Sequence, residues 1–323
     1  MYNTAVGYLA GTLVTTGVNN TLIGGLAGDA ITTGSSNAAL GYNSLGLNTT
    51  GARNVAMGAE SLSANTTGAD NVAIGEDALT ANTTASNNTA VGTDSLKANT
   101  TGTNNVAVGK DALDSNTTGS NNTALGVDTL QANTTASDST ALGHGALAVS
   151  TGASNTAVGK YALVANTTGN ANVAVGNVSL DANTSGERNT AIGAEALGHN
   201  TTASANSAVG YKALFENTTG TNNTALGQDA LRANTTASNN TAVGLSALKA
   251  NTTGTLNTAV GQNSGASITT GIRNTTVGAA SLDAEIAGNY STAMGYGALS
   301  VQSNASSTDV YNTAVGYLAG AAV

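Results

Sequence analysis

The chain has 323 residues, of which nine are Lys or Arg and 18 are Asp or Glu, giving a formal net charge of -9. Such an acidic chain lacks the basic footprint of nucleic-acid binding, so we expect no nucleic-acid partner. Cys is absent, which excludes disulfides and Cys metal sites. No stretch reaches the ~18 apolar residues of a membrane span, and the start, MYNTAVGYLAG, does not resemble a secretory signal.

A pentapeptide of the form N-T/V-A-V-G recurs from end to end. Its 19 copies start at Asn3, Asn20, Asn37, Asn54, Asn71, Asn88, Asn105, Asn122, Ser139, Asn155, Asn172, Asn189, Asn206, Asn223, Asn240, Asn257, Asn274, Ser291 and Asn312. Every step is 17 residues except one of 16 after Ser139 and one of 21 after Ser291. This period predicts a single continuous repeat array over residues 1–323, in which each repeat contacts its neighbours.

One unit, for example residues 105–121 (NVAVGKDALDSNTTGSN), is numbered here from position 1 to position 17. Positions 2–4 predict a short strand with position 3 facing away from positions 2 and 4. Gly at position 5 predicts a turn, and positions 8–14 (A-L-x-A-N-T-T) predict a second strand that ends at a second turn. Position 10, which holds Lys97, Asp114, Arg232 and Lys249, is expected to be solvated.

Two strands and two turns per unit predict an all-β fold, a parallel β-solenoid whose coils stack about 4.8 Å apart. Stacking places Asn on Asn, so that their amides bond to one another along the stack. We expect a thin core of about one Val, one Leu and a few Ala per coil. Position 3 is Ala in 17 of the 19 copies, with Leu22 and Thr276 as the exceptions. A position kept so small predicts close approach to the opposite wall or to another chain, and we expect three chains to pack together.

Some units depart from the pattern. Residues 10–17 (AGTLVTTG), 27–34 (AGDAITTG) and 264–271 (SGASITTG) form a second subtype, interpreted as drift in the outer strand. The long unit predicts a lengthened coil with an exposed loop at residues 296–311. The YNTAVGYLAG of residues 2–11 reappears at residues 311–320, which suggests a piece of a longer fibre.

The pentapeptides NVAIG (71–75), NTAIG (189–193) and NSAVG (206–210) resemble those of the YadA-like heads of trimeric autotransporter adhesins. The resemblance implies a left-handed β-roll, a homotrimer and adhesion outside the cell to a surface glycan or protein. The familiar unit is shorter, and these residues contain no stalk, neck or membrane barrel. Because the longer unit is also similar to repeats of phage and environmental fibre proteins, we expect the shaft or head of an extracellular, cell-surface or virion fibre.

The acidic residues and the two His are the candidates for metal binding or catalysis. Position 7 is often acidic, and a solvated face is favoured over a metal site because the Gly- and Asp-rich turn of Ca²⁺-binding β-rolls is absent. The acidic residues are Glu60, Asp77, Asp94, Asp111, Asp128, Glu195 and Asp229. His144 and His199 stand far apart, with no catalytic constellation around them. We therefore expect no enzyme, no catalytic residue, no cofactor and no metal.

The Asn-x-Thr/Ser motif recurs at position 12, and turn chemistry with ladder hydrogen bonds is favoured over glycosylation. Its residues are Asn48, Asn65, Asn82, Asn99, Asn116, Asn133, Asn166, Asn183, Asn200, Asn217, Asn234 and Asn251. The Thr rows at positions 13 and 14 leave an ice-binding β-solenoid open as an alternative. Uncapped strand edges leave a further alternative, a filament that grows by end-to-end stacking of coils.

Overall fold

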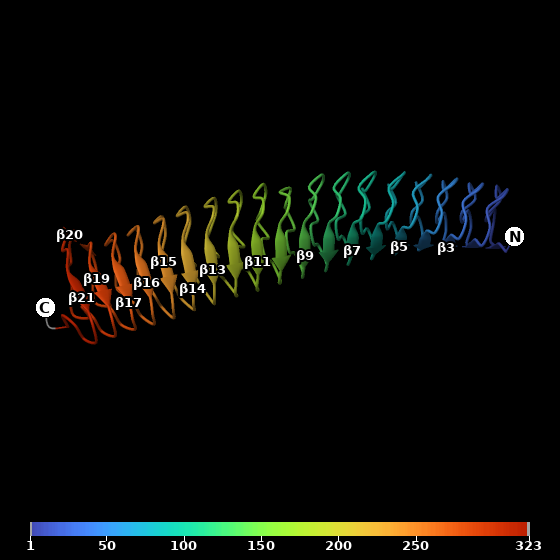
Figure 1. Ribbon diagram of the computed structural model, residues 1–323. Coiled ribbons are helices and arrows are strands. Elements are labelled where there is room, and N and C mark those ends of the chain that lie inside the picture. The colour runs from blue at the N-terminus through green and yellow to red at the C-terminus, as the bar shows by residue number, and fades with distance from the viewer. Residues whose placement is uncertain (1, 322–323) are drawn as a thin grey trace. The chain divides into compact units, whose positions relative to one another are not determined.

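The computed structural model describes residues 2–321, which contain strands and turns and no helix (Figure 1). The chain divides into two compact units, Met1–Lys160 and Tyr161–Val323, called unit 1 and unit 2. Each unit is a parallel β-solenoid that repeats every 17 residues with few exceptions. This confirms the all-β class and the solenoid that the sequence period predicts.

Unit 1 contains one parallel sheet in which each strand pairs with the next along the chain. Its strands are β1 (Thr4–Val6), β2 (Thr21–Ile23), β3 (Ala38–Leu40), β4 (Val55–Met57), β5 (Val72–Ile74), β6 (Thr89–Val91), β7 (Val106–Val108), β8 (Thr123–Leu125), β9 (Thr140–Leu142) and β10 (Thr156–Val158). Equivalent positions pair, as Ala107 does with Ala124. The 16-residue step keeps this register, because Ala157 pairs with Ala141.

Unit 2 has the same arrangement, with each main strand paired in parallel with the next. These strands are β11 (Val173–Val175), β12 (Thr190–Ile192), β13 (Ser207–Val209), β14 (Thr224–Leu226), β15 (Thr241–Val243), β16 (Thr258–Val260), β17 (Thr275–Val277), β19 (Thr292–Met294) and β21 (Thr313–Val315). The lengthened coil adds a second, two-stranded parallel pair, β18 (Gly288–Asn289) with β20 (Thr308–Asp309). Residues 305–309 of this coil are exposed.

The second strand expected at positions 8–14 is wrong, because that segment is a series of turns. Positions 7 and 9 have positive φ, as at Asp111 (57°) and Leu113 (53°). Their N–H groups consequently point opposite ways along the stack. Asp111 donates to Thr93 O of the preceding coil at 3.1 Å, and Leu113 donates to Thr129 O of the following coil at 3.0 Å. Neighbouring coils thus remain hydrogen-bonded without an extended backbone.

The core also differs from the expectation. Val, Ile or Leu at position 4 lies on the outside, whereas Ala at position 3 points inward, as Val108 and Ala107 illustrate. The interior is built from Ala at position 3, Ala or Ser at position 8 and Leu at position 9, with Asn at positions 1 and 12. The aliphatic side chain at position 4 is therefore only partly buried and lies outside the core of its own coil.

The two exceptions at position 3 show what holds Ala small elsewhere. Leu22 shares its coil with Gly28 at position 9, where other coils have Leu, and a Cβ added to Gly28 would lie 2.8 Å from Leu22 Cδ2. The same Cβ would lie 2.7 Å from Ile31 at position 12. Thr276 faces Gly265 of the preceding coil, where an added Cβ would lie 3.6 Å from Thr276 Oγ1, although its own coil keeps Leu282 at position 9. Position 3 therefore faces the opposite wall of its own solenoid, and the second subtype is a repacked core rather than drift in an outer strand.

Two buried Asn ladders run along each unit, as the repeat predicts. At position 12, Asn99 Nδ2 donates to Asn82 Oδ1 at 3.1 Å and to Gly102 O at 3.0 Å. At position 1, the backbone N–H of Asn105 donates to Asn88 Oδ1 at 2.9 Å. Each amide thus joins its own coil to the preceding one, which satisfies polar groups that would be costly to bury unpaired.

The position 12 ladders end where the sequence changes. Asn133 is followed one coil later by Ser150, and Asn251 by Ile268. The Oδ1 atoms of both Asn133 and Asn251 are buried without a hydrogen-bond partner among the described residues. Ser and Ile have no amide to donate, so the last Asn of a run retains an unused acceptor.

Candidate functional site

The outer face of each sheet carries a row of exposed aliphatic side chains. Positions 2 and 4 point outward, and neither carries a charged residue in any copy. The exposed residues at position 4 are Val6, Ile23, Leu40, Met57, Ile74, Val108, Leu125 and Leu142 in unit 1, and Ile192, Leu226, Val260, Met294 and Val315 in unit 2. We call these rows the aliphatic faces. A contiguous exposed apolar surface marks an interaction site.

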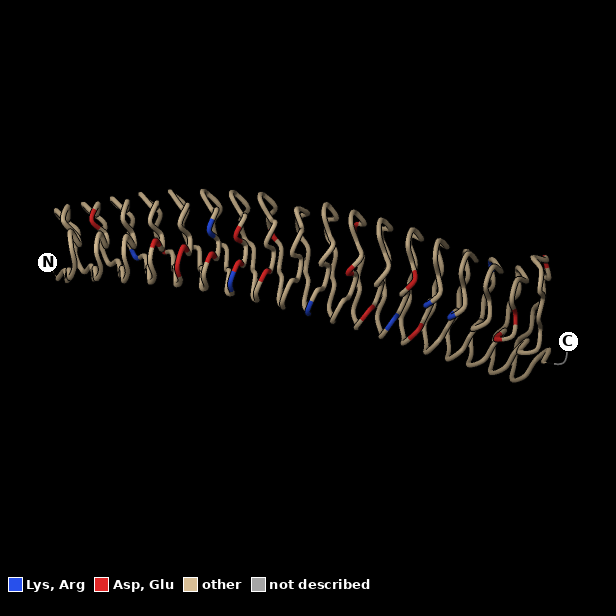
Figure 2. Tube along the Cα trace, turned by 180° about the vertical axis from the view of Figure 1, so that it is seen from behind, with Lys and Arg blue, Asp and Glu red and all other residues tan. Residues whose placement is uncertain are grey.

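Charged residues are sparse along the chain (Figure 2), and none stands at position 2 or 4 of a repeat. Several acids of position 7 are paired: Lys97 Nζ lies 2.8 Å from Asp94 and 2.9 Å from Asp77. Hydrogen bonds to Asp94 and Asp77 raise the pKa of Lys97. Within residues 2–321, no three His, Asp or Glu side chains come close enough together to hold a metal ion.

The Asn-x-Thr motifs are part of the interior. Every Asn of these motifs is fully buried at position 12, and Asn65 Nδ2, for example, donates to Asn48 Oδ1 and Gly68 O. In the folded chain, the side-chain nitrogen that would accept a glycan is therefore buried and inaccessible. The Thr hydroxyls of position 13 bridge coils, as Thr66 Oγ1 does by donating to Thr83 O at 3.0 Å.

A buried carboxylate occupies position 12 near the lengthened coil. Glu285 is fully buried, and its Oε1 accepts hydrogen bonds from the backbone N–H groups of Ile286, Ala287, Gly288 and Asn304. Its Oε2 accepts from the side-chain amides of Gln302 and Asn304, both at 2.8 Å. Burial raises the pKa of Glu285, but the hydrogen bonds from Gln302, Asn304 and the backbone outweigh it, so that its pKa lies below the ordinary value. This site organises the lengthened coil.

A second side-chain cluster of unit 2 surrounds Phe215, the only Phe of the chain. The Phe215 ring lies 4.3 Å from the His199 ring and 5.2 Å from Lys212 Nζ. Gly198 makes room for it, since a Cβ there would lie 2.8 Å from the Phe215 ring. His199 Nδ1 lies 2.8 Å from Glu216 Oε2. His199 and Glu216 are thereby brought together from adjacent coils.

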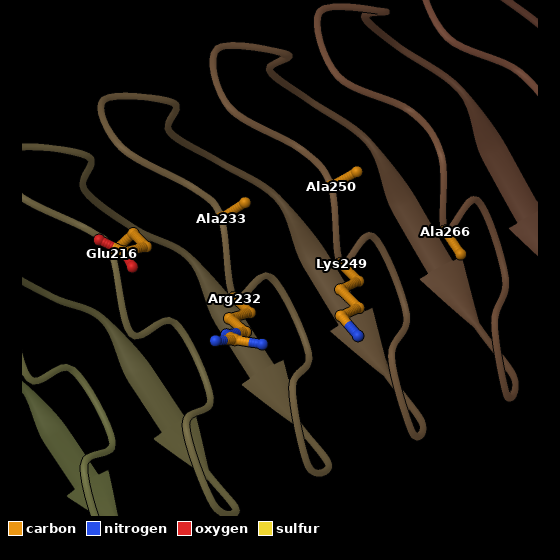
Figure 3. Close-up of a pocket in the computed structure, with 6 residues that line it drawn as sticks. All are labelled: Glu216, Arg232, Ala233, Lys249, Ala250 and Ala266. Carbon is orange, nitrogen blue, oxygen red and sulfur yellow. The ribbon is translucent and has the colours of Figure 1, made fainter.

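A shallow groove of about 360 Å³ adjoins this cluster (Figure 3). Three backbone hydrogen bonds build it across four successive coils: Glu216 N to Arg232 O, Ala233 N to Lys249 O, and Ala250 N to Ala266 O, each 3.0 Å long. Arg232 and Lys249 occupy position 10 of adjacent coils, and the alanines next to them leave the surface open (Figure 3). The volume lies at the small end of the roughly 300–1,000 Å³ that is usual for ligand sites.

Sequence reasoning placed Arg232 and Lys249 only on a solvated face. The signal that could have found the groove is the run Phe215, Arg232, Lys249, which fills position 10 of three consecutive coils after Gly198. Position 10 residues are 17 apart in sequence yet adjacent in space, so a motif scan along the chain does not join them. Aligning the repeats with one another shows that Phe215, Arg232 and Lys249 follow one another at position 10.

Comparison with known proteins gives no relative: no family model and no curated protein matches the chain. Within residues 2–321 there is also no helix of the length and apolarity that crossing a membrane requires. Fold and surface together define a tandem-repeat parallel β-solenoid protein with uncharged aliphatic sheet faces.

Proposed function

We propose that this chain is the shaft or head of an extracellular, cell-surface or virion fibre, in which several copies pack their aliphatic faces together. The observation that carries the proposal is the row of exposed Val, Ile, Leu and Met side chains at position 4. The resemblance to YadA-like heads favours three copies around one axis. The fibre acts as a stiff spacer that gives multivalent attachment to a surface.

The occupant of the aliphatic face that fits best is another copy of the same chain. An aliphatic row that repeats once per coil is matched by a partner surface with the same spacing, and this chain has one. The net charge of -9 opposes association of copies elsewhere, whereas the aliphatic faces are uncharged, so association is least opposed there.

Magnitudes support such packing. Full burial of one Val, Leu or Ile side chain contributes about 1.5–3 kcal/mol. The cost of associating two proteins is about 4–15 kcal/mol. Most of the exposed position 4 side chains are only 36–48% exposed, so burying what remains over about ten coils contributes about 6–12 kcal/mol, which is comparable with that cost. Many weak surface contacts along such a fibre would then add up by avidity.

Light scattering of the purified chain at two concentrations tests the proposal. We expect a constant mass near three times the 31.2 kDa of the chain. A mass that rises with concentration supports the alternative, a filament grown by end-to-end stacking of coils. A constant monomer contradicts packing of the aliphatic faces, and thermal hysteresis of that monomer would then support the second alternative, an ice-binding solenoid.

A further inference from the structure

Within residues 2–321, the groove over Glu216, Arg232 and Lys249 has one cation without an ion pair, Lys249, and one in a long ion pair, Arg232. In the described part of the chain, the Lys249 ammonium has no ion pair and no side-chain hydrogen bond. Arg232 Nε lies 3.7 Å from Asp229 Oδ1, which is beyond hydrogen-bond distance. Lys97, by contrast, lies within 2.9 Å of two carboxylates. The groove therefore offers the unpaired ammonium of Lys249 beside a guanidinium, that of Arg232, which a long ion pair holds only weakly.

Arg232 and Lys249 are held next to each other by the fold. The hydrogen bond from Ala233 N to Lys249 O fixes their coils in register, and both side chains leave from the same position of the repeat. Like charges that are held close together repel each other. An anion shared between the two side chains would remove this repulsion and would form charge-assisted hydrogen bonds with both.

The rest of the groove suits a small ring with hydroxyl groups better than a bare ion. Ala233, Ala250 and Ala266 give it a flat, weakly apolar floor (Figure 3). Glu216 adds a hydrogen-bond acceptor at one end. Phe215 occupies position 10 of the coil before that of Arg232, in the same row as Arg232 and Lys249. Carboxylate-binding cations, an acceptor for hydroxyls and apolar surface together match a carboxylated sugar.

We propose that this groove binds a carboxylated saccharide, with Arg232 and Lys249 holding the carboxylate and Glu216 accepting a hydroxyl. The groove is shallow and open to solvent, so it also admits a sugar that is part of a longer chain. This inference deepens the adhesive part of the proposed function and rests on it, but it does not depend on how many copies associate.

The test is a calorimetric titration of the full chain with digalacturonate, a disaccharide of two uronic acids. Its uncharged counterpart, digalactose, and acetate are titrated in parallel. We expect digalacturonate to bind, and at least ten-fold weaker binding in Lys249→Gln and in Arg232→Gln. Lys249→Arg retains the charge and should bind within about three-fold of the original chain. Lys97→Gln removes a paired cation elsewhere and is the matched control with unchanged binding.

Three outcomes overturn the inference: no binding of digalacturonate, equal binding of digalactose, or equal loss in Lys97→Gln. Acetate that binds as tightly as digalacturonate, and is lost in the same variants, reduces the groove to an anion site and also overturns the saccharide assignment. The mass of each sample by light scattering separates the two proposals. A trimer that ignores digalacturonate refutes the groove alone, whereas a monomer that binds it refutes the fibre packing alone.

Discussion

Leu22 occupies the space that Gly28 leaves open, and a Cβ on Gly28 would lie 2.8 Å from Leu22 Cδ2. Positions 3, 9 and 12 therefore behave as one packing unit with two solutions. In the commoner solution, a small Ala at position 3 accompanies Leu at position 9 and Asn at position 12. In the other, position 9 is Gly, as at Gly28, and position 12 is an apolar residue, as at Ile31.

This packing predicts that a smaller side chain at position 3 destabilises one coil and a larger side chain at position 3 destabilises another. Leu22→Ala should leave a cavity and cost about 2–5 kcal/mol. Ala107→Leu, placed in a coil that keeps Leu113, should overpack the core and cost about 1–3 kcal/mol. Hydrogen exchange of the coil amides measures both, and Thr21→Ala on the outer face is the control with little effect. Unchanged exchange in Ala107→Leu would contradict the inward orientation of position 3.

The period, the parallel register and the Asn ladders could be predicted because they depend only on which residues recur every 17 positions. The second strand was predicted wrongly because positive φ at Leu113 (53°) cannot be inferred from a Leu side chain, which rarely adopts it. The wrong core at position 4 has a related cause. Ala107 and Val108 are both apolar, and a three-residue strand does not say which face is inside. Leu113, which fills the interior on the opposite wall of the coil, leaves room for Ala107 but not for a larger side chain, so Ala107 faces inward.

The candidate surfaces were predictable to different degrees. The aliphatic face was visible in the sequence as a row but was assigned to the interior. The groove depends on Arg232 and Lys249 lying in adjacent coils, and on Lys249 having no carboxylate within ion-pair distance in residues 2–321, neither of which follows from the order of residues along the chain. Glu285 gave no sequence signal beyond replacing Asn at position 12, although it organises the hydrogen bonds of the lengthened coil.

The aliphatic face predicts a selective effect of charge. Leu125 and Val127 are similarly exposed, at 36% and 41%, but only Leu125 lies at position 4. Leu125→Glu should reduce the associated mass measured by light scattering, because it buries a charge between copies. Val127→Glu should leave the mass unchanged. Equal effects of the two substitutions would show that copies do not meet through this face.

The Asn ladder predicts unequal costs for one and the same substitution. Asn99→Ala removes the bonds to Asn82 Oδ1 and Gly102 O, and also the bond that Asn116 Nδ2 donates at 2.9 Å. Several buried polar groups then lose partners, at about 1–3 kcal/mol each. Asn133→Ala removes an oxygen that has no partner to lose, so it should cost less.

Hydrogen exchange in the adjoining coils of unit 1 measures this difference. The local readout is needed because a repeat array need not unfold in a single step. Conservative Asn99→Asp should be damaging too, since a carboxylate cannot donate to Asn82 Oδ1. If Asn133→Ala proved as costly as Asn99→Ala, the ladder bonds would not be the source of the stability.

The lengthened coil predicts opposite responses at two acids that lie two residues apart. Glu285 has a lowered pKa, so it stabilises the folded coil above the unfolded value of about 4.3. That contribution is lost as the pH falls through the folded pKa. Burial raises the pKa of Asp283, whose buried Oδ1 has no hydrogen-bond partner in the described chain. Its charged form therefore destabilises the coil above that pKa, and protonation relieves the penalty.

At neutral pH, Glu285→Gln should destabilise the coil by roughly 2–4 kcal/mol, because its new amide faces the amide donors of Gln302 and Asn304. Asp283→Asn should be neutral or slightly stabilising. The protection factor of the Gly288 amide, which donates to Glu285 Oε1 at 2.8 Å, is the readout. In the original chain, this protection factor should decrease as the pH drops below the unfolded-state pKa of about 4.3. In Glu285→Gln it should be low at every pH. A Gly288 amide that stays protected in Glu285→Gln would show that the backbone alone, rather than the carboxylate, orders the lengthened coil.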